Sequence, residues 1–339
     1  MFKWNFKVKT AVIVLSVFML IFMAGCGKTA DQPTQTPPTV QTPAPAPAPM
    51  PEAQPQPEKP ALSAKDVVLE RTKDFAAERA GGANFMAAPA DAWKAIQESD
   101  VFVVDVRAPE DFEKGHIPGA YNVNFVGGEL ATLLDRIPMD KPVYVFCYSG
   151  QQANQVNGAL NVAGFDAKAI TGGSGNWTKA ELPLEGTGAN LLKDAPVVSK
   201  AETEEDQFAW EAAEGYLGSI VSAETRNLMA PAKLHEELQA NPDKYYVMDI
   251  RAPKADNYDQ GHIEGANFYS WDDIEKQMGD LPMDKKIVVT CWSGNNAGQT
   301  VALLKMNGYD AQSLLGGFDN GWLEKNKPEA ERKPLPVVQ

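Results

Sequence analysis

The chain has 339 residues, of which 44% are hydrophobic and 22% are charged, so it holds enough apolar material for two domains of ordinary size. Its formal net charge of −14 argues against nucleic acid and anionic lipid surfaces as partners. Its three cysteines are too few for a disulfide framework, so the thiols need another explanation.

Residues 1–25 have the pattern of a bacterial lipoprotein signal peptide. Three lysines precede an apolar run over residues 10–24, which is shorter than the roughly 20 residues that a membrane-spanning helix needs. The run ends at Met23-Ala24-Gly25-Cys26, which resembles the bacterial lipobox and implies that Cys26 is lipidated. We therefore expect an exported protein of the bacterial cell envelope, anchored to a membrane by its N-terminal lipid and facing outside the cytoplasm. An ordinary signal peptide or an uncleaved anchor is the alternative.

Residues 26–62 are predicted to form a proline-rich stalk. Eleven prolines lie between Pro33 and Pro60, and this composition favours extended polyproline II over a packed core. Such a stalk would hold the following domains away from the membrane. A disordered spacer without a geometric role fits the composition equally well.

The rest of the chain contains an internal repeat. Cys147 and Cys291 are 144 residues apart (291 − 147), and each follows an apolar run and precedes a Ser-Gly turn. Further motifs recur at this spacing or at two residues more: Asp105–Pro109 and Asp249–Pro253, Gly115–Ala120 and Gly261–Ala266, Pro138–Lys141 and Pro282–Lys285, and Gly172–Gly173 and Gly316–Gly317. Because solenoid repeats are much shorter, this period indicates duplication of a whole domain. We predict domains at 63–188 and 205–330 with a linker at 189–204.

Each copy alternates strand and helix patterns. Short apolar runs of strand length occur at Val101–Val106 and Val143–Phe146 in the first copy, and at Tyr246–Ile250 and Ile287–Thr290 in the second. After each cysteine we expect a helix that ends near Gly164 or Gly308. These patterns predict an α/β fold with a parallel sheet and helices on both faces in each domain. Ligands of such sheets bind at the carboxyl ends of strands, where both cysteines fall.

Three motifs occur in order in both copies: Asp-x-Arg followed by Gly-His-Ile-x-Gly-Ala, a strand ending in Cys-x-x-Gly, and a late Gly-Gly followed by Trp177 or Trp322. This order resembles tandem rhodanese-like sulfurtransferases over Ala61–Gly186 and Glu204–Lys327. The resemblance implies that Cys147 and Cys291 accept sulfane sulfur, become persulfides and pass the sulfur to an acceptor. It implies small sulfur compounds or a sulfur-carrying protein as partners, and neither a cofactor nor a metal.

The resemblance also places the substrate-binding loops and their supports. The loop residues are Tyr148, Ser149, Gly150, Gln151 and Gln152 in the first copy, and Trp292, Ser293, Gly294, Asn295 and Asn296 in the second. The supporting residues are Asp105, Arg107, Asp249 and Arg251, which we expect to form charge networks that position the loops. Backbone N–H groups of such a loop, closed by a helix N-terminus, can stabilise a thiolate.

Both loops depart from the family at one position. The family's loop usually closes with arginine, Cys-x-x-Gly-x-Arg, whereas this chain has Gln152 and Asn296 there. An amide neither lowers the thiol pKa strongly nor holds an anion such as thiosulfate. Thiosulfate is therefore a doubtful donor, and a polysulfide or a protein-borne sulfur suits the site better. The absence of this arginine also argues against phosphatase or arsenate reductase chemistry, because enzymes of those classes need arginine to bind the oxyanion.

Other interpretations remain open. The two cysteines could be small core residues, and the whole chain a non-catalytic binding or interaction module on the cell surface. His116 and His262 fit a structural turn better than a catalytic base. Three scattered histidines and single cysteines make no metal-ligand cluster. Trp177 and Trp322 are expected to be packing residues.

Overall fold

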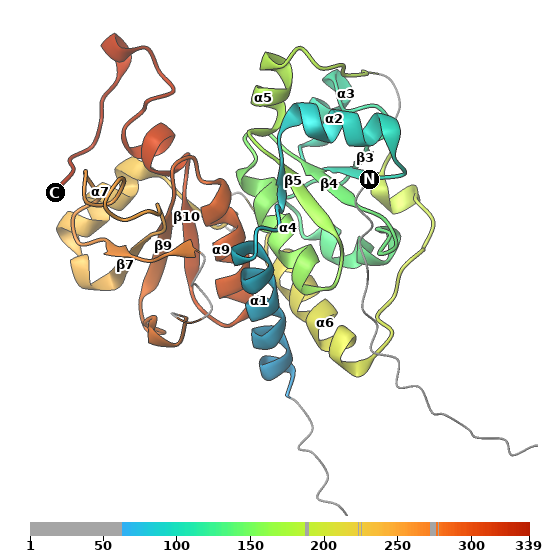
Figure 1. Cartoon of the computed structure of the whole chain (residues 1–339), viewed down its shortest axis with the longest axis horizontal. Coiled ribbons are helices and arrows are strands. Elements are labelled where there is room, and N and C mark those ends of the chain that lie inside the picture. The colour runs from blue at the N-terminus through green and yellow to red at the C-terminus, as the bar shows by residue number, and fades with distance from the viewer. Residues whose placement is uncertain (1–62, 187–189, 223, 225, 272–275, 277) are drawn as a thin grey trace, which may run out of the picture. The chain divides into compact units, whose positions relative to one another are not determined.

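The protein, described here by a computed structural model, contains two parallel five-stranded sheets (Figure 1). The structure describes residues 63–186, 190–222, 224, 226–271, 276 and 278–339. The predicted signal peptide, the lipidation site Cys26 and the stalk lie outside these residues. Among the described residues, none of the helices combines the length and apolar character that crossing a bilayer requires.

The two sheets have the same strand order. The first runs β1-β5-β4-β2-β3, and its strands are β1 (Met86–Ala87), β2 (Phe102–Asp105), β3 (Tyr121–Asn122), β4 (Val143–Phe146) and β5 (Ala167–Ile170). The second runs β6-β10-β9-β7-β8, and its strands are β6 (Leu228–Met229), β7 (Tyr245–Asp249), β8 (Asn267–Phe268), β9 (Lys286–Thr290) and β10 (Ala311–Leu314). All the pairings are parallel, which confirms the predicted α/β fold with two equivalent halves.

Helices cover both faces of each sheet. In chain order, the described helices before residue 200 are α1 (Ala64–Ala80), α2 (Pro89–Glu98), α3 (Pro109–Lys114), η1 (Glu129–Arg136), α4 (Gln151–Val162), α5 (Gly173–Lys179) and η2 (Leu192–Asp194). The described helices after residue 200 are α6 (Glu204–Gly218), α7 (Pro231–Ala240), η3 (Pro242–Lys244), η5 (Met278–Asp280), α9 (Asn295–Met306), η6 (Gly317–Trp322) and η7 (Glu329–Glu331). Along β4, Val143 and Val145 enter one hydrophobic cluster while Tyr144 and Phe146 enter another, as the two-residue period of a strand requires.

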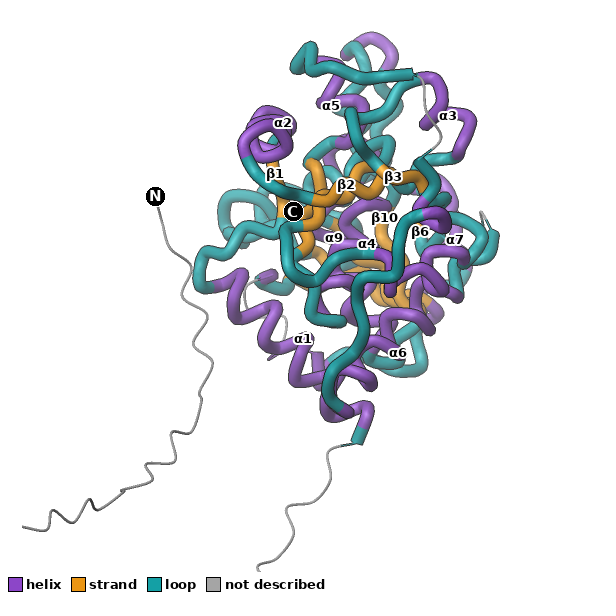
Figure 2. The backbone as a smooth tube through the Cα atoms, turned by 90° about the vertical axis from the view of Figure 1, so that its right-hand side faces the viewer, coloured by secondary structure: helices purple, strands orange, loops and turns teal. Residues whose placement is uncertain are grey.

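The first helix of each half packs on the core of the other half. Val68 and Phe75 of α1 are buried in the cluster that contains Val289 of the second sheet. Trp210 and Leu217 of α6 are buried in the cluster around the first sheet. Helices α1 and α6 lie side by side in both ribbon views (Figures 1 and 2). The predicted boundaries at residues 188 and 205 remain sequence predictions, and the hydrophobic contacts of α1 and α6 cross them.

The helix that follows each cysteine packs against its counterpart. Helices α4 and α9 approach closely because glycines face the partner: a Cβ added at Gly158 would lie 3.1 Å from the Cβ of Ala302, and one at Gly298 would lie 2.5 Å from the carbonyl oxygen of Gln151. Helix α4 therefore lies between its own sheet and α9, and almost all of its side chains are buried. This contact joins the two halves next to both cysteine loops.

Candidate active site

Cys147 lies in a loop whose backbone points at its sulfur. The residue follows β4, and Gly150 takes a left-handed conformation (φ +85°) immediately before α4 begins. The N–H groups of Gly150 and Ala153 donate to Cys147 Sγ at 3.1 and 3.3 Å. The loop and the helix N-terminus therefore form the backbone cradle that the sequence pattern predicts.

Cys291 repeats this arrangement after β9. Gly294 has φ +88° and precedes α9, and its N–H donates to Cys291 Sγ at 3.2 Å. Both thiols are free, and their residues are buried, with exposures of 0% for Cys147 and 2% for Cys291. Each loop can thus place hydrogen-bond donors on a sulfur anion while excluding water.

Burial dominates the acidity of both thiols. Burial raises the pKa of Cys147 above its ordinary value, although the N–H groups of the loop and of Ala153 oppose the shift. The pKa of Cys291 is raised for the same reason, against the N–H groups of its own loop and of Ala297. The position where the family carries arginine holds only the amide of Gln152 or Asn296. The loops therefore have donors for a thiolate but no cation at that position.

The residue after each cysteine anchors its loop to the segment that follows a neighbouring strand, β2 in the first half and β7 in the second. The Tyr148 hydroxyl accepts a hydrogen bond from the N–H of Ala108 at 3.1 Å and donates one to Asp111 at 2.8 Å. In the second half, Trp292 Nε1 donates to the side chain of Asn257 at 3.1 Å. These bonds fix the outer side of each loop.

The Gly-Gly pairs close the loops from the other side. The N–H of Ser174 donates to the Cys147 carbonyl at 2.8 Å, and the N–H of Phe318 donates to the Cys291 carbonyl at 2.7 Å. A Cβ added at Gly173 (φ +52°) would lie 2.2 Å from the carbonyl oxygen of Cys147. Only glycine can lie this close to the Cys147 carbonyl, which explains the Gly-Gly motif. The sequence alone did not reveal that role.

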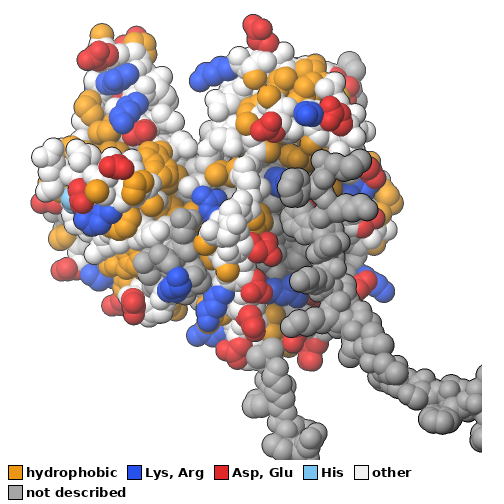
Figure 3. Space-filling model, in the orientation of Figure 1, with side chains coloured by type: hydrophobic (Ala, Val, Ile, Leu, Met, Phe, Trp, Pro, Cys, Tyr) orange, Lys and Arg blue, Asp and Glu red, His pale blue; other side chains and the backbone are white. Residues whose placement is uncertain are grey.

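The two loops meet across the α4–α9 contact. A cleft of about 560 Å³ opens between α5 and η6, where Figure 3 shows the surface hollowed between the two halves. Equivalent residues of the two copies line it in pairs: Ser149 with Ser293, Gly172 with Gly316, and Asn176 with Asn320. Tyr148, Asn295 and Lys179 also line it. One cleft therefore adjoins both cysteine loops, and its lining combines hydroxyl and amide groups with the apolar side chains of Pro231 and Leu315.

A family model described as Rhodanese-like domain matches residues 88–180 and 230–325. The chain belongs to the rhodanese-like family. The match confirms the resemblance inferred from the motifs and includes both cysteine loops. Thiosulfate sulfurtransferase GlpE of Glaesserella parasuis serovar 5 (strain SH0165) is 31% identical over 98 residues, which are 29% of this chain and 89% of that protein.

Two solved sulfurtransferase structures are also similar to this chain. Thiosulfate sulfurtransferase from Pseudomonas aeruginosa is 18% identical with a TM-score of 0.33, over 80% of this chain and 49% of that chain. The chain thus spans about half the length of that protein. The 3-mercaptopyruvate sulfotransferase SseA from Escherichia coli is 16% identical with a TM-score of 0.33, over 69% of this chain and 98% of that chain.

The supporting charges of this rhodanese-like protein are buried ion pairs. Arg107 Nη2 donates to Asp105 at 2.6 Å and to the carbonyl of Gly115 at 2.7 Å. Its guanidinium lies 5.0 Å from the ring centroid of Phe146, the residue before Cys147. The second half repeats both hydrogen bonds with Asp249, Arg251 and Gly261. The pairs hold the connection after β2 and β7 beside each cysteine loop.

The histidines and tryptophans belong to the framework. His116 Nδ1 lies 2.9 Å from the Phe112 carbonyl, and His262 Nδ1 lies 3.0 Å from the Tyr258 carbonyl, so each is tied into its own turn. The buried Trp177 and Trp322 donate to the carbonyls of Pro183 and Pro336. Among the described residues, no group of three or more His, Cys, Asp or Glu side chains is arranged to hold a metal ion.

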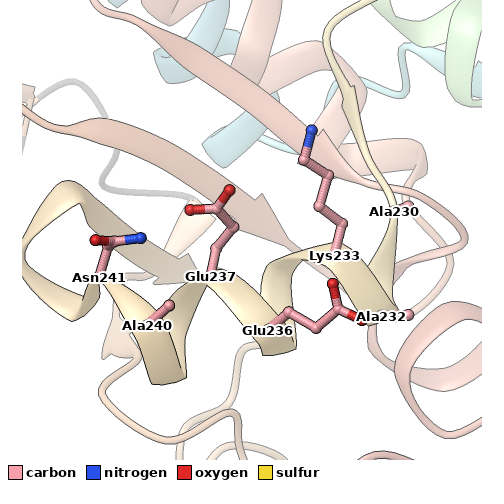
Figure 4. Close-up of a pocket in the computed structure, with 7 residues that line it drawn as sticks. All are labelled: Ala230, Ala232, Lys233, Glu236, Glu237, Ala240 and Asn241. Atoms are coloured by element: carbon pink, nitrogen blue, oxygen red, sulfur yellow. The ribbon is translucent and has the colours of Figure 1, made fainter.

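A separate hollow of about 600 Å³ lies along α7 (Figure 4). Lys233 and Glu237 project from the same side of that helix. Its lining comes from α7 and the residues flanking it: Ala230, Ala232, Lys233, Glu236, Glu237, Ala240 and Asn241. No residue of either cysteine loop lines this hollow, so we do not assign it to sulfur transfer.

The buried thiols predict an alkaline reactivity profile. Because the pKa of each thiol is raised, the thiolate fraction should still be increasing at pH 9. We expect the rate of iodoacetamide alkylation at Cys147 and Cys291, followed separately by peptide mass spectrometry, to rise past pH 9. The urea-unfolded chain is the control and should follow an ordinary thiol pKa of about 8.5. A plateau below pH 8 in the folded protein would contradict this assignment.

Proposed function

We propose that this rhodanese-like protein is an exported, lipid-anchored sulfurtransferase that carries sulfane sulfur as a persulfide on Cys147, on Cys291 or on both. The observation that carries the proposal is the duplicated cradle, in which the N–H of a left-handed glycine donates to each sulfur at 3.1 or 3.2 Å. A cysteine kept only as a small core residue does not need a helix N-terminus aimed at its sulfur.

The proposed reaction is a transfer between sulfur atoms. The cysteine thiolate attacks the outer sulfur of a donor R–S–SH, so the donor S–S bond breaks, a Cys–S–SH bond forms and R–S⁻ leaves. A nucleophilic acceptor then takes the outer sulfur and regenerates the thiolate. A raised thiol pKa lowers the thiolate fraction but raises its intrinsic nucleophilicity, so the cradle remains compatible with an electrophilic sulfane donor.

Polysulfides or a protein-borne persulfide are the proposed donors. Thiosulfate carries its charge on oxygens that an arginine fork would bind, and the loops hold Gln152 and Asn296 at that position. The cleft beside the loops offers hydroxyl and amide groups together with the ammonium of Lys179, and no described residue of its lining supplies a guanidinium fork for the oxygens of thiosulfate.

A non-catalytic binding module is the second candidate. It is favoured by the near-complete burial of both thiols and by their raised pKa values, which together slow any reaction of the free protein. An assay of labile sulfur on the cysteines separates the two candidates.

The persulfide itself is the direct test. Incubated with polysulfide and freed of excess reagent, the wild-type protein should release one cyanide-labile sulfur per reactive cysteine, detected as thiocyanate. Cys147→Ser or Cys291→Ser should remove one labile sulfur where the replaced cysteine is reactive, and the double variant should release none. Labile sulfur retained at the wild-type level in the double variant would refute the proposed function, and a wild-type protein that releases no labile sulfur would favour the binding module.

The missing cation can be restored in either loop. Gln152→Arg or Asn296→Arg should raise kcat/KM with thiosulfate by about tenfold or more, equivalent to about 1.4 kcal/mol, because a guanidinium binds an oxyanion through two parallel hydrogen bonds. Gln152→Lys is the matched control and should gain less, since it supplies charge without the fork. If neither arginine variant gains activity, the missing charge is not what limits thiosulfate use.

The anchor rests on Cys26 alone. In a bacterial host fed labelled fatty acid, the wild-type chain should carry the label and sediment with membranes, because a lipidated cysteine supplies the anchor. Cys26→Ser should abolish the label, while Cys147→Ser should retain it. Persistent labelling of Cys26→Ser would rule out this site of lipidation.

A further inference from the structure

Gln151 belongs to the first cysteine loop, but its side chain is bound by the second half. Its Nε2 donates to Ser313 Oγ at 2.5 Å and to the Leu314 carbonyl at 2.9 Å. Its Oε1 accepts from the N–H of Gly316 at 3.1 Å. A carbonyl can only accept and a backbone N–H can only donate, so these partners fix the orientation of the amide. Gln151 is 1% exposed, and its polar side-chain atoms are used.

These bonds reach two parts of the second cysteine site. Gly316 is the first glycine of the pair that closes over Cys291, and the N–H of Phe318, two residues later, donates to the Cys291 carbonyl. The Gln151 side chain also covers the cysteine loop itself, because a Cβ added at Gly294 would lie 2.6 Å from its Cδ. Gln151 therefore contacts both the loop that donates to Cys291 Sγ and the segment that closes over it.

The reverse contact covers Gly150 in the same way, since a Cβ added there would lie 2.4 Å from Asn295 Oδ1, but its hydrogen bonds are fewer and weaker because the copies have diverged. Asn295 occupies the position of Gln151 and is one methylene shorter, and the position of Ser313 (313 − 144 = 169) is Ala169, which has no hydroxyl. Asn295 donates to Ser293 of its own loop at 3.1 Å. Its Oδ1 accepts from Asn154 at 3.5 Å, the limit for a hydrogen bond. The glutamine and its serine partner thus form a link that runs from the first loop to the second.

We propose that Gln151 is a positioning residue of the Cys291 site, so that the first half sets the geometry and reactivity of the second cysteine. The inference rests on the proposed function in taking Cys291 as a reacting group. Loss of the side chain opens the cover over Gly294 and releases the segment that begins at Gly316. Water then reaches the cradle, and the burial that disfavours the Cys291 thiolate is reduced.

The test compares Gln151→Ala with Gln155→Ala in the full chain. Gln155 is a matched control because it is also a fully buried glutamine of α4 that bonds the second half, through the Tyr216 hydroxyl and the Arg226 carbonyl, one turn away from the loop. The readout is the pH profile of iodoacetamide alkylation at each cysteine, measured by mass spectrometry well below the Tm of each variant.

In Gln151→Ala, we expect alkylation of Cys291 at pH 8 to accelerate about threefold to tenfold, because a downward shift of up to one pKa unit raises the thiolate fraction by up to about tenfold. Its profile should move to lower pH, while Gln155→Ala should lower the Tm and leave the profile of Cys291 unchanged. Equal Cys291 profiles in the two variants would overturn the proposal. The proposal would also be overturned if the alkylation rates of both cysteines in Gln151→Ala rose together to those of the unfolded chain.

Ser313→Ala provides a second variant if Gln151→Ala fails to fold. It removes one partner of Gln151 without changing either cysteine loop, so Cys291 should be alkylated faster and Cys147 should be unchanged. An unchanged Cys291 rate in this variant overturns the proposal. Alkylation requires no sulfur donor, so failure of this coupling is distinguishable from failure of the persulfide assay.

Discussion

The contact between α4 and α9 is the constraint on which the rest of this structure depends. Each helix begins at a cysteine loop, and glycines at Gly158 and Gly298 let the two backbones approach. A helix enclosed by its own sheet and by its counterpart has no solvent face, so its polar side chains need partners inside the protein. Gln299 accordingly donates to Asn154 across the contact at 2.7 Å. The packing that joins the halves therefore also fixes where both cysteine cradles lie.

The exchange of α1 and α6 reinforces the same joint. Each helix packs on the core of the opposite half, and the ion pair of Arg71 with Asp206 at 2.6 Å connects the two helices directly. Removing either helix would uncover apolar surface of the opposite half. The two rhodanese-like domains are thus parts of one packed unit, which is consistent with a single cleft lined by residues of both.

Local patterns in the sequence predicted the strands and the cysteine loops, because each depends on neighbouring residues, and the motifs shared by the two copies predicted the duplication. Thr203 and Asp206 form a capping box at the start of α6, where the sequence patterns predicted the end of a linker. The pairing of α1 and α6 with opposite cores could not be predicted, since a hydrophobic stripe does not specify which core it meets. The polar side chains of α4 are buried because α9 covers them, and the local sequence does not indicate that contact. The motifs located the cysteines, whereas the link from Gln151 to Gly316 required the tertiary structure.

The neutral residues at Gln152 and Asn296 change what controls these thiols. A cation in the loop would stabilise a thiolate through its charge, which depends only weakly on small movements of the backbone. Backbone N–H groups act through hydrogen bonds that weaken steeply as distance and angle depart from their optimum. Reactivity here therefore depends on whatever holds the loop in place: Tyr148 on the outer side, the Gly-Gly pair on the inner side and, for Cys291, the amide of Gln151. In such a site, residues that never touch the sulfur determine how easily it ionises.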